Sequence, residues 1–151
     1  MVSRFEQFSG AVSCIYRCIQ KIERVEMAKY GLKGPHAQCL LTMGHHPEGL
    51  TSSELCTLCD KDKAAISRTV AELEREGLVI RNTKGSNRYR ALLKLTQQGE
   101  TAAAQVEERA KLAVEKAGEG MTDQQRAVFY EVLGLIAGHL QEICEDGLEG
   151  E

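Results

Sequence analysis

The chain has 151 residues, of which 42% are hydrophobic and 27% charged, and its formal net charge is −3. This is the composition and size of one ordinary globular domain with room for a hydrophobic core. We find no run of eighteen apolar residues and no apolar signal-peptide core near Met1. We therefore expect neither a membrane span nor export, and a cytoplasmic protein.

The first element predicted is a long helix over 4–28. Its apolar residues recur at spacings of three and four, close to a heptad seam, and such a seam needs a partner surface. They are Phe5, Phe8, Val12, Ile15, Ile19 and Ile22. Pro35 then suits the first turn of a second helix, which must end near Pro47 because the residue before a proline avoids helical angles.

Two closely spaced helices follow. The run from Thr51 to Glu54 is a capping box that opens a short third helix. Asp62 suits the N-cap of a fourth helix, and Gly77 suits the left-handed residue that closes it. The inward face of this fourth helix is one apolar stripe at helical spacing, formed by Ile66, Val70 and Leu73. Two helices joined this tightly form a helix-turn-helix arrangement.

The outward face of the fourth helix is small or cationic near its N-terminal end, as the residues Lys63, Ala64, Ser67, Arg68 and Ala71 show. Such a face fits the major groove, where Lys and Arg reach guanine edges and Ser reaches bases or phosphates. Two strand-like runs come next, 78–81 and 91–95, and the loop between them, 83–87, reads as a hairpin turn.

The local charge also favours nucleic acid. Residues 61–94 contain nine Lys or Arg against four Asp or Glu, a balance of +5, whereas the rest of the chain carries −8. A phosphate footprint requires such an asymmetry, although solvated charged surfaces are the ordinary alternative. We predict that the following residues contact DNA: Ser52, Lys61, Lys63, Ala64, Ser67 and Arg68, with Lys84, Arg88 and Arg90 on the hairpin.

The last two predicted helices are apolar on broad faces. Thr96 suits the cap of a fifth helix, which Gly118 to Gly120 should end. Its predicted inner face is small: Ala102, Val106, Ala110, Ala113 and Ala117. Thr122 and Gln125 make a capping box for a sixth helix that runs to about Cys144. That helix carries two apolar stripes, so it should be buried on more than one side.

These elements predict a mainly α fold with a small β-hairpin wing (α+β). We expect one domain, with a winged helix-turn-helix lobe over residues 34–96 and an all-helical dimerisation lobe over 1–30 and 97–146. No third layer is left to cover the sixth helix, so a homodimer is the economical arrangement. A two-fold dimer presents two recognition helices to successive major-groove faces, which predicts an imperfect palindrome of double-stranded DNA as the partner.

The run LCTLCDKDKAAISRTVAELEREGLVIR resembles the helix-turn-helix of the MarR family of winged-helix transcriptional regulators. The run LKLTQQGE is similar to the Leu-Thr-x-x-Gly with which that family closes its wing, and the similarity covers nearly the whole chain. The chain departs from the family at the wing tip. Asn87-Arg88-Tyr89-Arg90 stands where the family usually carries Asp followed within two residues by Arg. We expect Arg88 or Arg90 to take over the wing contact.

The resemblance implies a sequence-specific DNA-binding regulator, most commonly a repressor, that a small-molecule effector releases from DNA. The family's usual pocket lies between the dimer layer and the winged helix. Residues that could line it here are Tyr16, Tyr30, His36, Cys39 and Met43, each of which would serve equally well as ordinary packing.

Metal and thiol responses are the alternatives within the same fold. His36, Cys39, His45, His46 and Glu48 could supply ligands, but we favour a helix end with solvent-facing histidines and predict no metal or other cofactor. We expect most of the six cysteines to be small buried hydrophobes. Cys14 and Cys18 are redox candidates, although an apolar seam beside them should lower their reactivity. Cys56 and Cys59 form a CxxC without the second pair that a zinc site needs.

Other function classes are less well supported. No Gly-rich phosphate loop, HExxH or GxSxG occurs, and no catalytic signature surrounds any cysteine, so we predict that the protein is not an enzyme. A winged helix that binds protein instead of DNA stays open. Binding to double-stranded DNA at several salt concentrations distinguishes the two.

Overall fold

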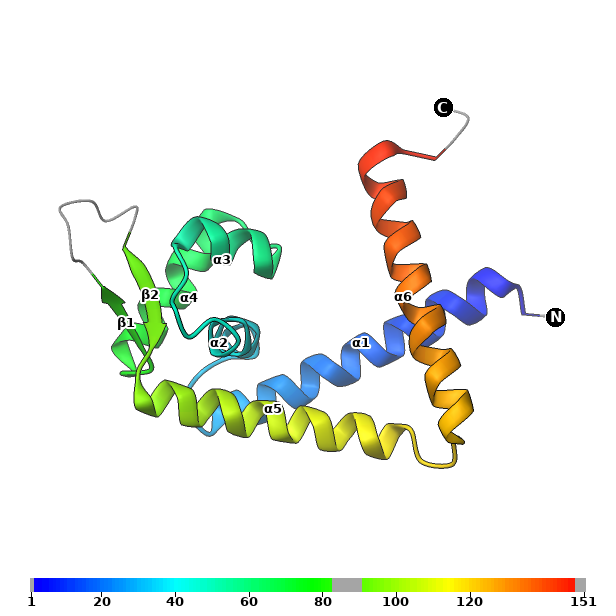
Figure 1. Cartoon of the computed structure of the whole chain (residues 1–151), viewed down its shortest axis with the longest axis horizontal. Coiled ribbons are helices and arrows are strands. Elements are labelled where there is room, and N and C mark those ends of the chain that lie inside the picture. Colours follow the sequence, from blue (N-terminus) through cyan, green and yellow to red (C-terminus); the bar gives the residue numbers. More distant parts are fainter. Residues whose placement is uncertain (1, 83–90, 149–151) are drawn as a thin grey trace. The chain divides into compact units, whose positions relative to one another are not determined.

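The computed structural model describes residues 2–82 and 91–148 (Figure 1). The elements are α1 (Arg4–Ala28), α2 (Pro35–Gly44), α3 (Ser52–Cys59), α4 (Lys63–Arg75), β1 (Val79–Asn82), β2 (Leu92–Leu95), α5 (Gln97–Ala117) and α6 (Asp123–Asp146). The predicted fold class, mainly helical with a two-stranded antiparallel wing, is confirmed. The wing turn predicted over 83–87 lies outside the described residues, as do Lys84, Arg88 and Arg90.

The chain divides into two compact units, residues 1–111 and 112–151. The first holds α1 to β2 and most of α5, and the second holds the end of α5 and α6. The helix-turn-helix and its wing therefore belong to one unit.

Side-chain caps fix where the helices begin. Thr51 Oγ1 accepts a hydrogen bond from the Glu54 backbone N–H at 3.2 Å, and Glu54 Oε2 accepts one from the Thr51 N–H at 2.8 Å. Thr122 and Gln125 repeat this capping box at α6. Asp62 Oδ1 accepts from the Ala65 N–H at 2.7 Å. Each predicted cap satisfies backbone donors that the first helical turn leaves unpaired, so these helix starts are confirmed.

One hydrophobic core lies in the first unit. The buried apolar side chains of the described residues all fall between Met27 and Val106. The predicted stripe of α4, formed by Ile66, Val70 and Leu73, lies in this core. On α5, Ala102, Ala103 and Val106 are buried, whereas Ala117 at the end of the helix is exposed. The predicted inner face of α5 is thus buried along the first half of the helix and not at its end.

The wing is anchored to the helices at several points. β1 and β2 pair antiparallel, with Val79 opposite Leu95 and Asn82 opposite Leu92. Leu50, in the loop before α3, adds a bridge to Leu93 through two backbone hydrogen bonds of 3.0 and 2.7 Å. The start of α3 and the second strand of the wing are therefore held together by main-chain bonds.

A single hydroxyl joins the end of α4 to the start of α5. Thr96 Oγ1 donates to the Gly77 carbonyl at 2.7 Å and accepts from the Gly99 N–H at 3.0 Å. Gly77 has φ +73°, the left-handed conformation that favours glycine. A Cβ placed on Gly99 would lie 2.0 Å from the Leu78 carbonyl oxygen, so only glycine fits there.

We expect Gly99→Ala to lower the free energy of unfolding by about 1–3 kcal/mol, because the backbone of Leu78 would have to move to admit the methyl group. Gly10→Ala on α1 is the matched control, since a Cβ there meets nothing within 4 Å. The control should leave stability unchanged or raise it slightly. Urea unfolding followed by circular dichroism, at equal protein concentrations, measures both. Equal stability of the two variants would contradict the close approach at Gly99.

A buried carboxylate connects α1 to α5. Glu26 is 5% exposed. Its Oε2 lies 2.5 Å from Lys29 Nζ and its Oε1 lies 3.3 Å from Arg109 Nε. The hydrogen bond from Lys29, with that from Arg109, holds the pKa of Glu26 below its usual value. Because the folded pKa is the lower one, the stability that this charge contributes is present above the unfolded pKa and lost as pH falls through the folded pKa.

We accordingly expect Glu26→Gln to cost about 1.5–3 kcal/mol of unfolding free energy at pH 7, the worth of hydrogen bonds to a charged group. The difference from the native protein should shrink as pH falls below the ordinary glutamate value of 4.5. Glu107→Gln is the control, because its ion pair with Lys111 lies on the surface, where solvent screens the attraction between the two charges. Denaturant titrations at several pH values provide the measurement, and a constant difference across pH would contradict the role of the Glu26 charge.

In the second unit, α6 has no buried residue. Its exposed large apolar side chains include Val128, Phe129, Val132, Leu133, Leu135, Leu140 and Ile143. By length and composition alone, α6 is apolar enough to cross a membrane, although it contains no uninterrupted run of eighteen apolar residues. Polar residues interrupt the apolar run within α6, but its mean hydropathy remains high enough to pass the test. One such helix is weak evidence for a membrane span, because helices that pack against protein pass the same test.

Candidate nucleic-acid interface

The turn between α3 and α4 is short and fixed by its backbone. Asp60 follows the last residue of α3 with φ +49°, a left-handed conformation that aspartate tolerates better than most residues. The Lys61 N–H donates to the Cys56 carbonyl at 3.1 Å, which closes the end of α3. Asp62 then caps α4. This turn sets the direction in which α4 leaves α3, next to the wing (Figure 1).

The outward face of α4 is arranged as its sequence predicts. Lys63, Ala64, Ser67 and Arg68 are exposed, and Lys61 in the preceding turn is exposed as well. Ser52, the first residue of α3, is half-buried. The first half of α4 thus presents small and cationic side chains on a continuous surface. The opposite face of the helix is the buried apolar stripe.

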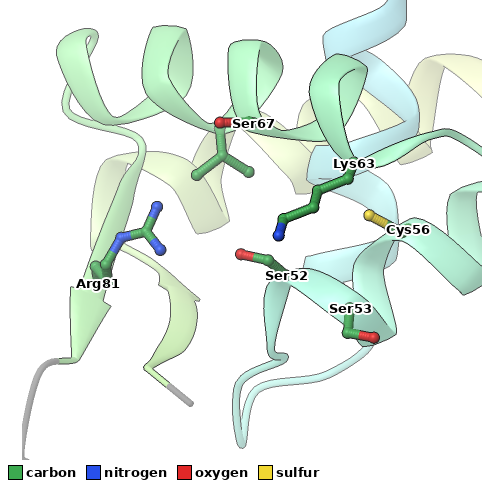
Figure 2. Close-up of a pocket in the computed structure, with 7 residues that line it drawn as sticks. Ser52, Ser53, Cys56, Lys63, Ser67 and Arg81 are labelled. Carbon is green, nitrogen blue, oxygen red and sulfur yellow. The ribbon is translucent and has the colours of Figure 1, made fainter. Parts of the chain in front are cut away.

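Three of the predicted DNA contacts also line a hollow of about 620 Å³ between α3, α4 and β1: Ser52, Lys63 and Ser67. In Figure 2, Lys63 and Ser52 point toward one another across this hollow, and the Arg81 side chain enters from β1. Lys61, Ala64 and Arg68 do not line the hollow. The hollow places donors from three elements within one concave surface, which suits a phosphate or a base edge.

Arg81 is the functional candidate that the sequence analysis missed. Its guanidinium donates to Glu74 Oε1 at 3.0 Å and is held between α4 and β1 with 25% of the side chain exposed. In the sequence it is one cation at the end of an apolar strand. Its position on the same strand face as the buried Val79 is the signal that could have placed it toward α4.

The five residues predicted for an effector pocket have different surroundings. Cys39 and Met43 are core residues. The Tyr30 hydroxyl donates to the Gln105 side chain on α5. Tyr16 is exposed and lines a hollow of about 190 Å³ that none of the other four lines. The effector pocket stays a prediction.

His36 is the fifth of these, and it corrects our interpretation of the histidines. It is 3% exposed, with Nε2 2.5 Å from Glu72 Oε2 on α4 and Nδ1 3.0 Å from the Lys33 carbonyl. His36 lies in the first turn of α2 and faces α4, so it is not a solvent-facing histidine, whereas His45 at the far end of α2 is exposed. Within 2–82 and 91–148, no three His, Cys, Asp or Glu side chains are grouped as a metal site.

The cysteines also differ from expectation. Cys39 and Cys59 are buried and Cys56 is half-buried, but Cys14, Cys18 and Cys144 are exposed in the chain. The prediction that most are buried is therefore wrong for the single chain. The apolar seam of α1 is itself exposed, so none of the residues that the structure describes covers Cys14 or Cys18, and their low reactivity stays a prediction.

Comparison with known proteins agrees with this geometry. The sequence model of the MarR family matches residues 30–88. The crystal structure of MarR aligns with 89% of this chain and 98% of its own, at a TM-score of 0.73 and 25% sequence identity. The chain belongs to the MarR family. A MarR transcriptional regulator from Methanosarcina mazei Go1 shares the fold with a TM-score of 0.80, at 22% identity over 91% of this chain and 99% of that one.

A curated relative of this MarR family chain is a putative transcriptional regulatory protein for the hcr operon of Thauera aromatica. It is 31% identical over 107 residues, which are 71% of this chain and 55% of the relative, so the chain spans little more than half of that protein's length. The MarR family consists of transcriptional regulators, and membership agrees with the prediction that the protein is not an enzyme.

Proposed function

We propose that the protein is a sequence-specific double-stranded DNA-binding regulator that acts as a cytoplasmic homodimer. The observation that carries the proposal is the surface of α4. Its first half exposes Lys63, Ser67 and Arg68 beside small residues, while the opposite stripe is buried. A helix held rigidly with such a face can enter the major groove.

The contacts divide by position. Lys63, Ser67 and Arg68 on α4 are proposed to reach base edges or the phosphates next to them, and Ala64 lets the helix approach the bases closely. Ser52 at the start of α3 and Lys61 in the turn are proposed to bind phosphates, which fixes the register without reading sequence. Lys84, Arg88 and Arg90 complete the proposed footprint from the hairpin.

Dimer formation follows from the exposed apolar faces. In the proposed arrangement residues 34–96 bind DNA, and residues 1–30 and 97–146 form the interface between subunits. The exposed apolar seam of α1 and the doubly apolar α6 support it, because a stable soluble chain rarely leaves so much apolar surface uncovered. Two-fold symmetry would then match an imperfect palindrome in the DNA.

The finer form of the proposal is repression that a small-molecule effector relieves. It is supported by the family resemblance, and its pocket would involve some of Tyr16, Tyr30, His36, Cys39 and Met43. An effector that binds the free dimer more tightly than the DNA-bound dimer would shift the population away from DNA.

Selection of DNA from a random library, followed by fluorescence anisotropy at several salt concentrations, tests the function. We expect an imperfect palindrome bound at least 10³-fold more tightly than scrambled DNA, with affinity that falls as salt rises. A clean dimer that binds all duplexes equally weakly would instead support a winged helix that recognises a protein.

A further inference from the structure

Two buried sulfurs meet between α2 and the end of α3. Cys39 Sγ and Cys59 Sγ are 4.0 Å apart, although the residues are separated by 20 positions in sequence. Each side chain is 2% exposed and belongs to the core beneath the helix-turn-helix. A disulfide has a bond of about 2.05 Å, so the two sulfurs must approach by about 2 Å for the bond to form.

We propose that Cys39 and Cys59 form a reversible disulfide when the protein meets a hydroperoxide, which makes this pair an oxidation site inside the winged helix. The inference is independent of DNA binding. It concerns different residues from Cys14 and Cys18, which the sequence singled out.

The surroundings favour Cys59 as the sulfur that reacts first. The thiol of Cys39 hydrogen bonds to it, the Thr42 hydroxyl lies 3.6 Å away, and Lys61 adds positive charge. The hydrogen bond from Cys39, more than the other two, lowers the pKa of Cys59, and the same interaction raises the pKa of Cys39. The thiolate is the nucleophilic form of cysteine, so a lowered pKa provides more of it at neutral pH.

The reaction balances with one hydroperoxide as the oxidant. The Cys59 thiolate attacks the terminal peroxide oxygen, the O–O bond breaks, and the leaving oxygen takes a proton to become water or an alcohol. Cys59 is then a sulfenic acid. The Cys39 sulfur attacks the Cys59 sulfur, its proton and the sulfenic hydroxyl leave as water, and the S–S bond forms. Two thiols are oxidised by two electrons, and the peroxide is reduced by two.

In this proposal the oxidant approaches Cys59 through local opening at the end of α3. Cys59 is the last residue of α3 and the left-handed Asp60 follows it, and helix ends open locally more readily than helix interiors. Cys56, one turn earlier, lines the hollow of about 620 Å³ next to α4. Because the disulfide would pull on the residue that precedes the turn to α4, oxidation would act close to the Asp62 cap.

The test is peptide mapping of the full chain. The reduced protein is treated with hydrogen peroxide, remaining thiols are alkylated, and peptides are analysed by mass spectrometry without reduction. We expect a linked peptide pair that contains Cys39 and Cys59, lighter by two hydrogens than its reduced components, and its disappearance after dithiothreitol. Cys59→Ala should abolish the pair, whereas Cys56→Ala and Cys144→Ala should retain it.

Mapping the unmutated protein decides the matter even if Cys59→Ala fails to fold, which circular dichroism will show. A disulfide between Cys56 and Cys59, disulfides between subunits alone, or irreversible sulfinic acid at Cys59 would each overturn the proposal. Because no DNA is present, these outcomes are separate from success or failure of the proposed DNA-binding function.

Discussion

Replacing Leu133 and Leu140 together by glutamate should convert the protein to a monomer and weaken operator binding by about 10²–10⁴-fold, the usual gain from linking two binding modules. Both leucines lie on one exposed stripe of α6, two helical turns apart. Two carboxylates in a closely packed apolar interface would have to lose their hydration without partners, which strongly opposes association.

Gln141→Glu is the matched control, because helical geometry turns position 141 away from both apolar stripes of α6. It adds charge to the same helix and should leave the dimer intact. Light scattering measures the oligomeric state, and fluorescence anisotropy measures operator affinity. A double variant that remains dimeric would exclude the centre of α6 from the interface and leave α1 as the remaining apolar face.

The second large effect concerns Arg68. We expect Arg68→Ala to cost about 1–3 kcal/mol at each half-site and to relax the preference at one base pair there. Arg68 is exposed on the first half of α4, where the proposed geometry brings it to base edges. The paired substitution Arg88→Ala with Arg90→Ala should instead weaken all sequences evenly and lower the salt slope by about 1 for each lost phosphate contact.

Arg75→Ala provides the control on the same helix, since Arg75 lies in the last turn of α4, away from the N-terminal reading face. Salt titrations of selected and scrambled DNA with each variant give both affinity and discrimination. The assignment of reader and anchor is reversed if Arg68→Ala weakens both DNAs equally and the wing variant alone loses discrimination.

The sequence predicted most of what depends on local spacing. The caps at Thr51, Asp62 and Thr122 and the stripe through Ile66, Val70 and Leu73 are patterns within a few residues, and all are confirmed. These patterns are reliable in sequence because capping and helical periodicity involve only residues of the segment itself.

Pairings between distant residues were not predictable in this way. Three such pairs depend on how the helices pack: the contact of His36 with Glu72, the approach of Cys39 to Cys59, and the ion pair of Arg81 with Glu74. The solvent-facing interpretation of His36 was wrong for the same reason. Spacing in sequence gives the face of a helix that a residue occupies, but not the element opposite to it.

The hydroxyl of Thr96 has a consequence for the geometry of the proposed dimer. This hydroxyl hydrogen bonds to Gly77, just after α4, and to Gly99, in the first turn of α5. Gly99 also packs closely against the backbone of Leu78. In the proposed dimer, α5 leads from this joint toward the subunit interface. A rotation of α5 would therefore rotate the winged helix-turn-helix lobe of the same subunit with it, because the bonds of Thr96 and the close packing of Gly99 hold the two together. The half-site spacing that the proposed dimer accepts would then depend on this joint, far from any residue proposed to contact a base.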